Sequence, residues 1–334
     1  MDRPTDPPHP DPPDDDLDYR HRSGRVHYSA HQRGVDATAL GQLLLLLPGT
    51  LMSLLVLLLL SGGLDAWLGV PLWIPPVVWL ASGALLFHRP TEDLLARHLL
   101  RLHRPMPDEY ARLAPVWREV TARAGVDGRT YELWVEDSDH LNAYAAAGHI
   151  VGVTRFALDH LPSSQLAAVL AHELGHHTGG HVWTSLLGCW YALPGRAAWY
   201  AIRLAVSFAM AVTRSFSWAA TAALVLVIAA LTYSTLTLLH GLPLVLLVTP
   251  YLIAAVGRRA ELRADRHAAA LGFGPTLAQV LVAMHAAETS SGRPSLAAAG
   301  ASPHAPGLLA RLLSTHPDYP TRLHRLKPYL EPTR

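Results

Sequence analysis

The chain has 334 residues, half of them hydrophobic, a formal net charge of +1 and a single cysteine, Cys189. A balanced charge, with no basic block interleaved with aromatic residues, argues against nucleic acid as a partner, and one cysteine excludes an intramolecular disulfide or a cysteine zinc cluster. Any bound metal must therefore be held by His, Asp or Glu.

Residues 1–39 are predicted to form a disordered tail, which begins MDRPTDPPHPDPPDDD. This Pro- and Asp-rich segment carries too little apolar surface to offset the entropy of ordering it. A long polar segment before the first apolar run also argues against a cleaved secretory signal and favours a signal anchor.

Two uncharged apolar runs, 43–60 and 66–87, follow within residues 40–88. Each is long enough to cross a hydrocarbon layer of ~30 Å, so they predict a transmembrane hairpin. Arginines precede the first run and follow the second, whereas the loop between them carries only Asp65. The positive-inside rule then places the N-terminus on the cytoplasmic side of the cell membrane.

Residues 105–183 are predicted to form the first part of a soluble α+β domain. The apolar positions of 107–124 have helical spacing. Residues 131–135 alternate as a strand, and 142–146 and 150–154 flank a short turn as a β-hairpin. We therefore expect a small β-sheet in this domain.

The stretch LAAVLAHELGHHTGGH holds His172, Glu173 and His176 in the spacing HExxH. A helix is expected here, beginning at Ser163 or Ser164 with a capping hydroxyl. Side chains four residues apart share a helix face, so the two histidines can bind one metal ion. Glu173 can hold a water molecule and accept its proton, which implies hydrolysis.

A second membrane region is predicted over 184–257, with a break near Gly241. Two routes are open. Either the stretches 183–212 and 218–256 cross once each, or the first lies at the interface and the second forms a hairpin. Both routes give two crossings, about four in total, and return the chain to the side that carries HExxH.

The last predicted segment, 258–334, opens with RRAELRADRHAAALG. Glu261 and Asp265 are four residues apart, so they share a helix face. Glu261 can supply the third ligand that a zinc hydrolase needs, and Asp265 can bind the other ring nitrogen of a ligand histidine. The alternative, a solvated helix of salt bridges, is disfavoured by the HExxH motif upstream. Three small residues would allow close packing against another helix: Ala260, Ala264 and Ala268.

His181 is a rival third ligand. It follows His172 by nine residues, which turns a continuous helix by about 180°, so it would face away from the metal. His177 is also off the ligand face. The longer pattern HExxHxxGxxH fails as well, because Val182 occupies its last histidine position.

HExxH followed far downstream by ExxxD, with two membrane segments before the first motif and apolar segments between the two, resembles the HtpX-like and CAAX-prenyl-protease family of integral membrane zinc metallopeptidases. The resemblance implies one zinc ion per chain, bound by His172, His176 and Glu261. It also implies that Glu173 is the general base and that Asp265 supports a ligand histidine from outside the ligand shell.

The resemblance covers about residues 40–330 and includes two smaller segments. NAYAAAGHIVGVT is similar to the family's substrate-edge strand, where Asn142 can fix an extended peptide. STHPDYPTRLHRL is similar to a C-terminal THP segment near the cleft, where His316 and Arg322 can contact substrate or stabilise an oxyanion. Ordinary turn residues are the alternative reading of Asn142 and His316.

These features predict a membrane-bound zinc metalloendopeptidase that hydrolyses peptide bonds with a zinc-activated water. Its expected partners are the lipid bilayer and polypeptide substrates, and the resemblance to the HtpX-like branch implies misfolded membrane proteins in quality control. The alternatives are a processing protease for prenylated or signalling peptides and a non-proteolytic, zinc-stabilised membrane scaffold. The active site is expected to face the cytoplasm, and the oligomeric state is left open.

Overall fold

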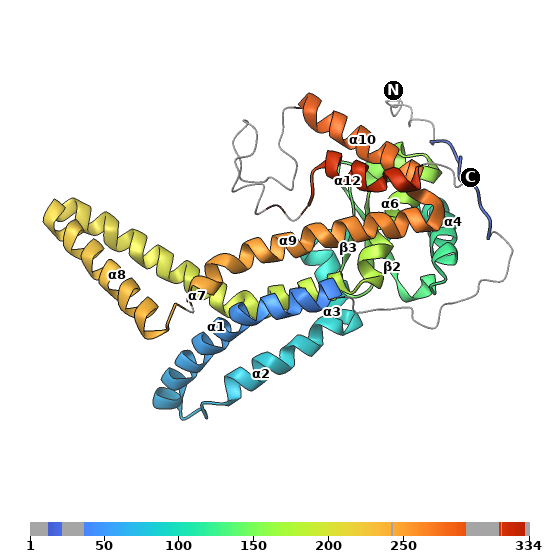
Figure 1. The fold of residues 1–334 in the computed structure, drawn as a ribbon. Helices are drawn as coiled ribbons and strands as arrows, with labels where there is room; N and C mark the ends of the chain where they lie inside the picture. The colour runs from blue at the N-terminus through green and yellow to red at the C-terminus, as the bar shows by residue number, and fades with distance from the viewer. Residues whose placement is uncertain (1–12, 22–36, 242, 292–313, 315, 331–334) are drawn as a thin grey trace, which may run out of the picture. The chain divides into compact units, whose positions relative to one another are not determined.

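The structure is a computed structural model that describes residues 13–21, 37–241, 243–291, 314 and 316–330 (Figure 1). The chain divides into two compact units. The sheet unit comprises residues 1–38, 87–183 and 257–334, and the apolar unit comprises residues 39–86 and 184–256. Each unit is therefore built from segments that are separated in sequence.

The apolar unit consists of long helices with exposed apolar side chains. Its elements are α1 (Ala37–Leu68), α2 (Ile74–Ser82), η1 (Gly83–Phe87), α7 (His181–Phe216), α8 (Trp218–Leu238) and the first part of α9 (Pro243–Ala268). In the described residues, three helical stretches are long and apolar enough to cross a membrane: Ala37–Leu68, Trp218–Leu238 and Pro243–Ala287, the last of which continues past residue 256 into the sheet unit. This confirms the expectation of a mostly helical membrane protein.

The second predicted span, 66–87, is divided differently from the expectation. The first three residues of that run, 66–68, belong to α1, which ends at Leu68. The chain then turns at Gly69, where φ is +66°. The apolar helix that follows, Ile74–Phe87, is shorter than the three candidate spans. At 1.5 Å per residue it rises about 21 Å, less than the ~30 Å hydrocarbon layer.

The predicted break near Gly241 is present. α8 ends at Leu238, His240 and Gly241 have φ of +49° and +76°, and α9 begins at Pro243. α7 is one continuous helix of 36 residues. The two predicted routes through this region stay predictions.

Polar contacts join α7 to its neighbours within the apolar unit. The Trp190 indole N–H donates to Ser82 Oγ at 3.0 Å, and the Tyr191 hydroxyl donates to the carbonyl of Leu80 at 2.8 Å. The backbone N–H of Gly195 donates to Ser53 Oγ in α1, also at 3.0 Å. Such hydrogen bonds fix helix register where lipid offers no competing partners.

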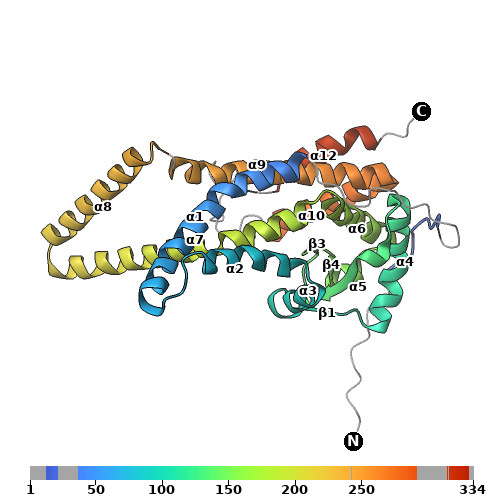
Figure 2. The ribbon, with the colours of Figure 1, turned by 90° about the horizontal axis from the view of Figure 1, so that it is seen from below.

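The sheet unit contains a four-stranded sheet in the order β1-β2-β4-β3. Its strands are β1 (Leu102–His103), β2 (Glu132–Glu136), β3 (Ala143–Ala146) and β4 (Ile150–Thr154). β3 and β4 form the predicted antiparallel hairpin, with Ala147 at φ +49° in the turn. β2 and β4 are parallel, and β3 lies at the edge of the sheet next to α6 (Figure 2).

Helices enclose the core of the sheet unit. They are α3 (Arg89–Leu94), η2 (Leu95–Leu99), α4 (Pro107–Ala124), η3 (Gly128–Thr130), α5 (Arg155–His160), α6 (Ser163–Thr178), η4 (Ala269–Phe273), α10 (Gly274–Ser291), α12 (Tyr319–Leu326) and η6 (Lys327–Tyr329). α6 packs against α4 and α10, and α10 also packs against α12. Leu113, Leu166, Leu170 and Leu281 are among the buried residues of this core.

The N-terminal segment differs from the expected disordered tail. Residues 13–21 lie against the core, where Leu17 is buried. Asp16 accepts hydrogen bonds from the Ser164 backbone N–H at 2.8 Å and from its hydroxyl at 2.7 Å. The predicted serine cap of α6 is therefore wrong: Pro162 is the N-cap without a side-chain bond, and Asp16 supplies the capping oxygen. The rest of the predicted tail, 1–12 and 22–36, lies outside the described residues.

Candidate metal centre

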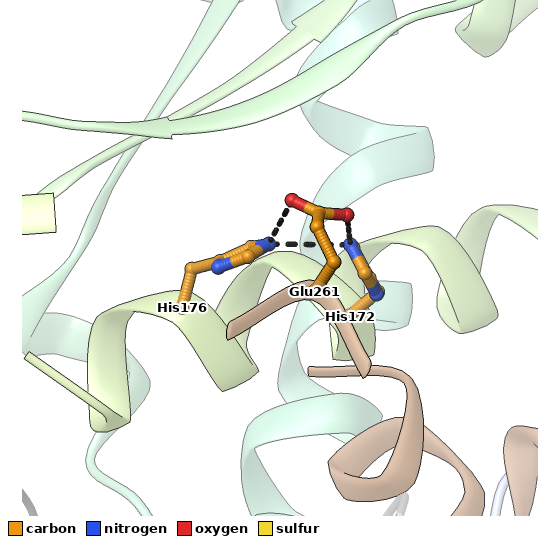
Figure 3. A group of neighbouring side chains, drawn as sticks. All are labelled: His172, His176 and Glu261. Atoms are coloured by element: carbon orange, nitrogen blue, oxygen red, sulfur yellow. Dashed lines mark hydrogen bonds and ion pairs between the residues drawn. The ribbon is translucent and has the colours of Figure 1, made fainter. Parts of the chain in front are cut away.

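Two histidines of α6 and a glutamate of α9 converge on one point (Figure 3). The Nε2 atoms of His172 and His176 lie 3.3 Å apart. Glu261 places Oε1 3.3 Å from His176 Nε2 and Oε2 3.5 Å from His172 Nε2. One ligand atom from each residue lies within 4.8 Å of the others, so two imidazoles and a carboxylate can share one ion.

Close packing of α6 and α9 makes this convergence possible. A Cβ on Gly175 would lie 3.0 Å from the Cα of Ala264 and 3.2 Å from the Cβ of His267. Glycine within the HExxH motif therefore lets α9 approach. The small face of α9 predicted from the sequence is buried, with Ala260, Ala264 and Ala268 at 5% exposure or less.

Asp265 connects the histidine helix to α12. Its Oδ1 lies 2.9 Å from His172 Nδ1, although the angle departs from hydrogen-bond geometry. Arg322 donates two hydrogen bonds to the same carboxylate, from Nε to Oδ2 at 2.8 Å and from Nη2 to Oδ1 at 2.6 Å. Asp265 thus lies beside a candidate ligand, and its expected role of supporting that ligand stays a prediction.

The electrostatics of the site favour a cation. Burial alone would lower the pKa of His172, but the carboxylates of Asp265 and Glu261 outweigh it and raise the pKa to about 10. Burial would raise the pKa of Asp265, but Arg322 and His172 hold it at about 2. The pKa of Glu261 is likewise held well below its usual range, against burial, by His172, His176 and His316. A metal ion at this point would replace the positive charge that a proton otherwise supplies.

Glu173 is buried beside the two candidate ligand histidines, and its carboxylate points at the sheet. Its Oε2 accepts a hydrogen bond from the Ala145 N–H of β3 at 2.8 Å. Burial raises the pKa of Glu173 above its usual range. A carboxylate with a raised pKa accepts protons more readily at neutral pH, as a general base must.

The C-terminal residues suggested by the resemblance reach the same carboxylates. His316 Nδ1 lies 3.1 Å from Glu261 Oε1, which raises the pKa of His316. Arg322 Nη1 lies 3.8 Å from Glu261 Oε2. His316 is half exposed and Arg322 is largely buried, so only the histidine retains wide access to solvent.

Asn142 lies at the start of β3. Its carbonyl accepts from the Thr154 N–H at 3.0 Å, and its N–H donates to Thr154 Oγ1 at 3.1 Å. The asparagine residue is exposed, and its backbone rather than its side chain makes these bonds. Asn142 thus directly precedes the edge strand whose Ala145 N–H donates to Glu173.

The rival histidines have other partners. His181 Nε2 lies 2.6 Å from Thr38 Oγ1, and His177 Nε2 lies 2.9 Å from the carbonyl oxygen of Ile150. Burial lowers the pKa of His181 to about 4, so the ring is neutral at neutral pH. The metal-compatible group found in the described residues includes neither histidine.

Sequence reasoning missed the support of the β3–β4 turn. Glu92 of α3 accepts from the Gly148 N–H at 3.2 Å and lies 3.0 Å from His149 Nδ1. Glu92 is 2% exposed. Glu92 stands next to Asp93 in the stretch RPTEDLLARHLLRLHR, which contains no motif that indicates this contact.

Comparison with known proteins shows the family of the chain. Residues 107–330 match the pattern described as Peptidase family M48. No curated protein matches. Among solved structures, the chain is similar to the crystal structure of Ste24p from S. mikatae, at 16% identity and a TM-score of 0.47. The match covers 81% of this chain and 61% of that one, so the chain spans about three fifths of that protein's length. On the sequence match over most of its length, the chain belongs to peptidase family M48.

Proposed function

We propose that this protein is a membrane-bound zinc endopeptidase whose ligands are His172, His176 and Glu261 and whose general base is Glu173. The observation that carries the proposal is the convergence of two imidazole nitrogens and one carboxylate within 4.8 Å. Glu173 adjoins the first histidine in sequence and is buried with it. Membership of a metallopeptidase family supports the same reaction class.

The donor set fits a single zinc ion per chain. Zinc in hydrolases takes three protein ligands of nitrogen and oxygen and leaves a position open. When bound, zinc would polarise a peptide carbonyl and would lower the pKa of a water molecule, so that the water loses its proton more easily and attacks that carbonyl. Asp265 and Arg322 would then hold the His172 ring in place, because a ligand histidine needs a partner on its second nitrogen.

Glu173 would take the proton from the attacking water and deliver it to the leaving amine. Its raised pKa suits both steps, because the carboxylate must gain and then lose the proton. His316 is half exposed beside Glu261 and can donate to the developing oxyanion. Arg322 is held by Asp265, so we assign it a positioning role.

We infer that an extended peptide pairs with the outer edge of β3, the edge opposite β4. The Thr154–Asn142 bond sets the register with β4, and hydrogen-bonded pairs alternate along an antiparallel ladder. The backbone groups of Ala143 and Ala145 consequently point away from β4, and the N–H of Ala145 points at Glu173. A substrate strand paired there would lie beside the general base, with Asn142 at its end.

The candidate spans support a place in the membrane, and arginines on the outer flanks of the apolar runs support a cytoplasmic active site. Misfolded membrane proteins of the cell membrane are then the substrates within reach. Quality control is the role that fits a protease with an edge-strand subsite, because backbone pairing tolerates many side chains.

The test is cleavage of unfolded casein by the detergent-purified full chain. We expect cleavage that a chelator abolishes and added zinc restores. Glu173→Gln should lower the rate by about 10²–10⁴-fold while the protein retains its zinc. The matched control is Asp108→Asn, which removes an exposed carboxylate of α4 and should cleave like the wild type.

Zinc content measured on the same samples distinguishes loss of the general base from loss of the metal. Undiminished cleavage by zinc-loaded Glu173→Gln would refute its role as the base. A folded, zinc-loaded wild type that leaves casein intact would favour the non-proteolytic scaffold.

A further inference from the structure

A basic cavity of about 580 Å³ lies in the sheet unit, between α9 and the α12–η6 segment. Four arginines line it: Arg259, Arg263 and Arg266 from α9, and Arg325 from α12. His324 also lines it, and the described lining residues include no carboxylate. This concentration of positive charge has no role in the proposed hydrolysis.

Helix geometry separates the cavity from the metal centre. At about 100° per residue, Arg259, Arg263 and Arg266 fall within roughly 60° of one another on α9. Glu261 falls on roughly the opposite side of the helix. The two faces of one helix therefore present carboxylates to the histidines and arginines to the cavity.

Three of the cavity arginines differ from several other arginines of the sheet unit. Those others pair with carboxylates, namely in Arg89–Glu132, Arg104–Asp93, Arg123–Glu119, Arg155–Asp137 and Arg322–Asp265. Within the described part of the chain, Arg259, Arg266 and Arg325 form no ion pair with a carboxylate. Arg266 Nε donates to the Leu262 carbonyl at 3.2 Å. Several cations that share one cavity repel one another, so an anion would stabilise the arrangement.

The chemistry of the lining selects the anion. Guanidinium groups bind phosphate oxygens through two parallel hydrogen bonds and keep their charge at all relevant pH values. Leu262, Pro328 and Tyr329 add apolar surface to the same cavity, which suits a phosphate attached to carbon. Thr38 comes directly before the apolar unit in sequence, and Arg259 comes three residues after that unit ends at Val256. Two of the lining residues are therefore close in sequence to segments that can cross a membrane.

We propose that this cavity binds a phosphate group, carried either by an anionic phospholipid headgroup or by free phosphate. The ligand would join α9, which carries Glu261 and Asp265, to α12, which carries Arg322. It would therefore stabilise the packing of α9 against α12, the two helices that the Asp265–Arg322 ion pair connects.

The test measures binding to the full-length purified protein in two arms. In the first, inorganic phosphate is titrated by calorimetry into protein in phosphate-free detergent, with chloride at matched ionic strength as the reference. In the second, the protein is taken from nanodiscs of phosphatidylcholine, with or without a minority of phosphatidylglycerol, and its retained lipid is identified by native mass spectrometry. Arg259→Gln and Arg325→Gln test one arginine from each helix, and Arg118→Gln, an exposed arginine of α4, is the control.

Each cavity variant is expected to weaken binding by about tenfold, because it removes one charge-assisted contact, whereas the control should bind like the wild type. Saturable phosphate binding that both cavity variants weaken would assign free phosphate. Retained phosphatidylglycerol that both variants lose would assign the lipid. If neither anion binds, or if the cavity variants bind as tightly as Arg118→Gln, the proposal is overturned. Since no arm measures cleavage, failure here is distinguishable from failure of the proposed peptidase.

Discussion

Arg322 forms a bidentate ion pair with Asp265, 57 residues earlier in the chain, and Asp265 lies 2.9 Å from His172 Nδ1. The C-terminal helix α12 thus reaches a candidate zinc ligand through one buried carboxylate. Asp265 is 1% exposed, so water cannot replace the arginine as its partner. The orientation of the His172 ring therefore depends on a contact between distant parts of the sequence.

Arg322→Lys should weaken zinc binding by about 10–100-fold, because an ammonium group cannot hold both oxygens of Asp265 in the same plane. The measurement is zinc affinity by competition with a chromogenic chelator. The control is Arg118→Lys, an exposed arginine of α4, which should leave zinc affinity unchanged. Equal zinc affinity in Arg322→Lys and wild type would show that Asp265 needs no bidentate partner.

Gly175→Ala should weaken both zinc binding and stability. Its new Cβ would lie 3.0 Å from the backbone of Ala264, so α9 would have to move and take Glu261 with it. Overpacking of this kind costs about 1–3 kcal/mol. Urea unfolding and zinc competition measure the two effects.

The control for this change is Gly179→Ala, which is also at the C-terminal end of α6. There the added Cβ would meet the end of the Arg263 side chain, which can rotate away at little cost. We therefore expect Gly179→Ala to retain zinc affinity. A stable, fully zinc-binding Gly175→Ala would mean that α6 and α9 do not need this close approach.

Several helices and strands could be predicted from the local sequence pattern alone. The helix expected at 107–124 is α4, and the hairpin expected around Ala147 is β3–β4, because helical periodicity and strand alternation depend on neighbours in sequence. The spacing of HExxH and ExxxD likewise indicated which side chains share a helix face. Short-range geometry is encoded in short-range sequence.

Long-range contacts were not predictable in the same way. Asp16 caps α6 across 148 residues, and a Pro- and Asp-rich tail has no periodicity that indicates a docking site. β2 pairs in parallel with β4, so the hairpin did not reveal the strand order. The arginine–aspartate pair beside His172 was visible as two candidate residues, but the bond between them required the fold.

Glu92→Gln should loosen the β3–β4 turn. Glu92 is buried, accepts from the Gly148 N–H and pairs with His149, and a neutral amide can keep at most part of this set. We expect a loss of about 1–3 kcal/mol and faster hydrogen exchange in β3. If β3 receives substrate, KM should rise more than kcat falls.

The neighbouring Asp93→Asn is the control, because Asp93 pairs with Arg97 and Arg104 on a more exposed surface. Surface ion pairs contribute little to stability, so its exchange pattern in β3 should match the wild type. Unchanged exchange of β3 in Glu92→Gln would show that the turn holds its position without the buried carboxylate.

Glu119→Gln should release the N-terminal segment. Glu119 side-chain oxygens accept from the backbone N–H of Arg20 at 3.1 Å, from that of His21 at 2.9 Å and from Arg123 Nε at 2.8 Å. Burial would raise the pKa of Glu119, but the bonds from Arg123, His21 and Arg20 outweigh it and lower the pKa. We expect the variant to lose about 2 kcal/mol near neutral pH and to be cut faster by trypsin after Arg20.

The stabilisation by Glu119 should depend on pH. Because the pKa of Glu119 is lower in the folded state, its contribution is full above the unfolded-state pKa of about 4.3 and disappears as the pH falls through the folded value. The difference in unfolding free energy between wild type and Glu119→Gln should therefore become smaller as the pH falls below about 4.3. Denaturant unfolding at several pH values measures this difference. Asp108→Asn, which removes an exposed carboxylate of the same helix, should show no such narrowing. A difference that persists unchanged in acid would mean that the charge of Glu119 does not hold the segment.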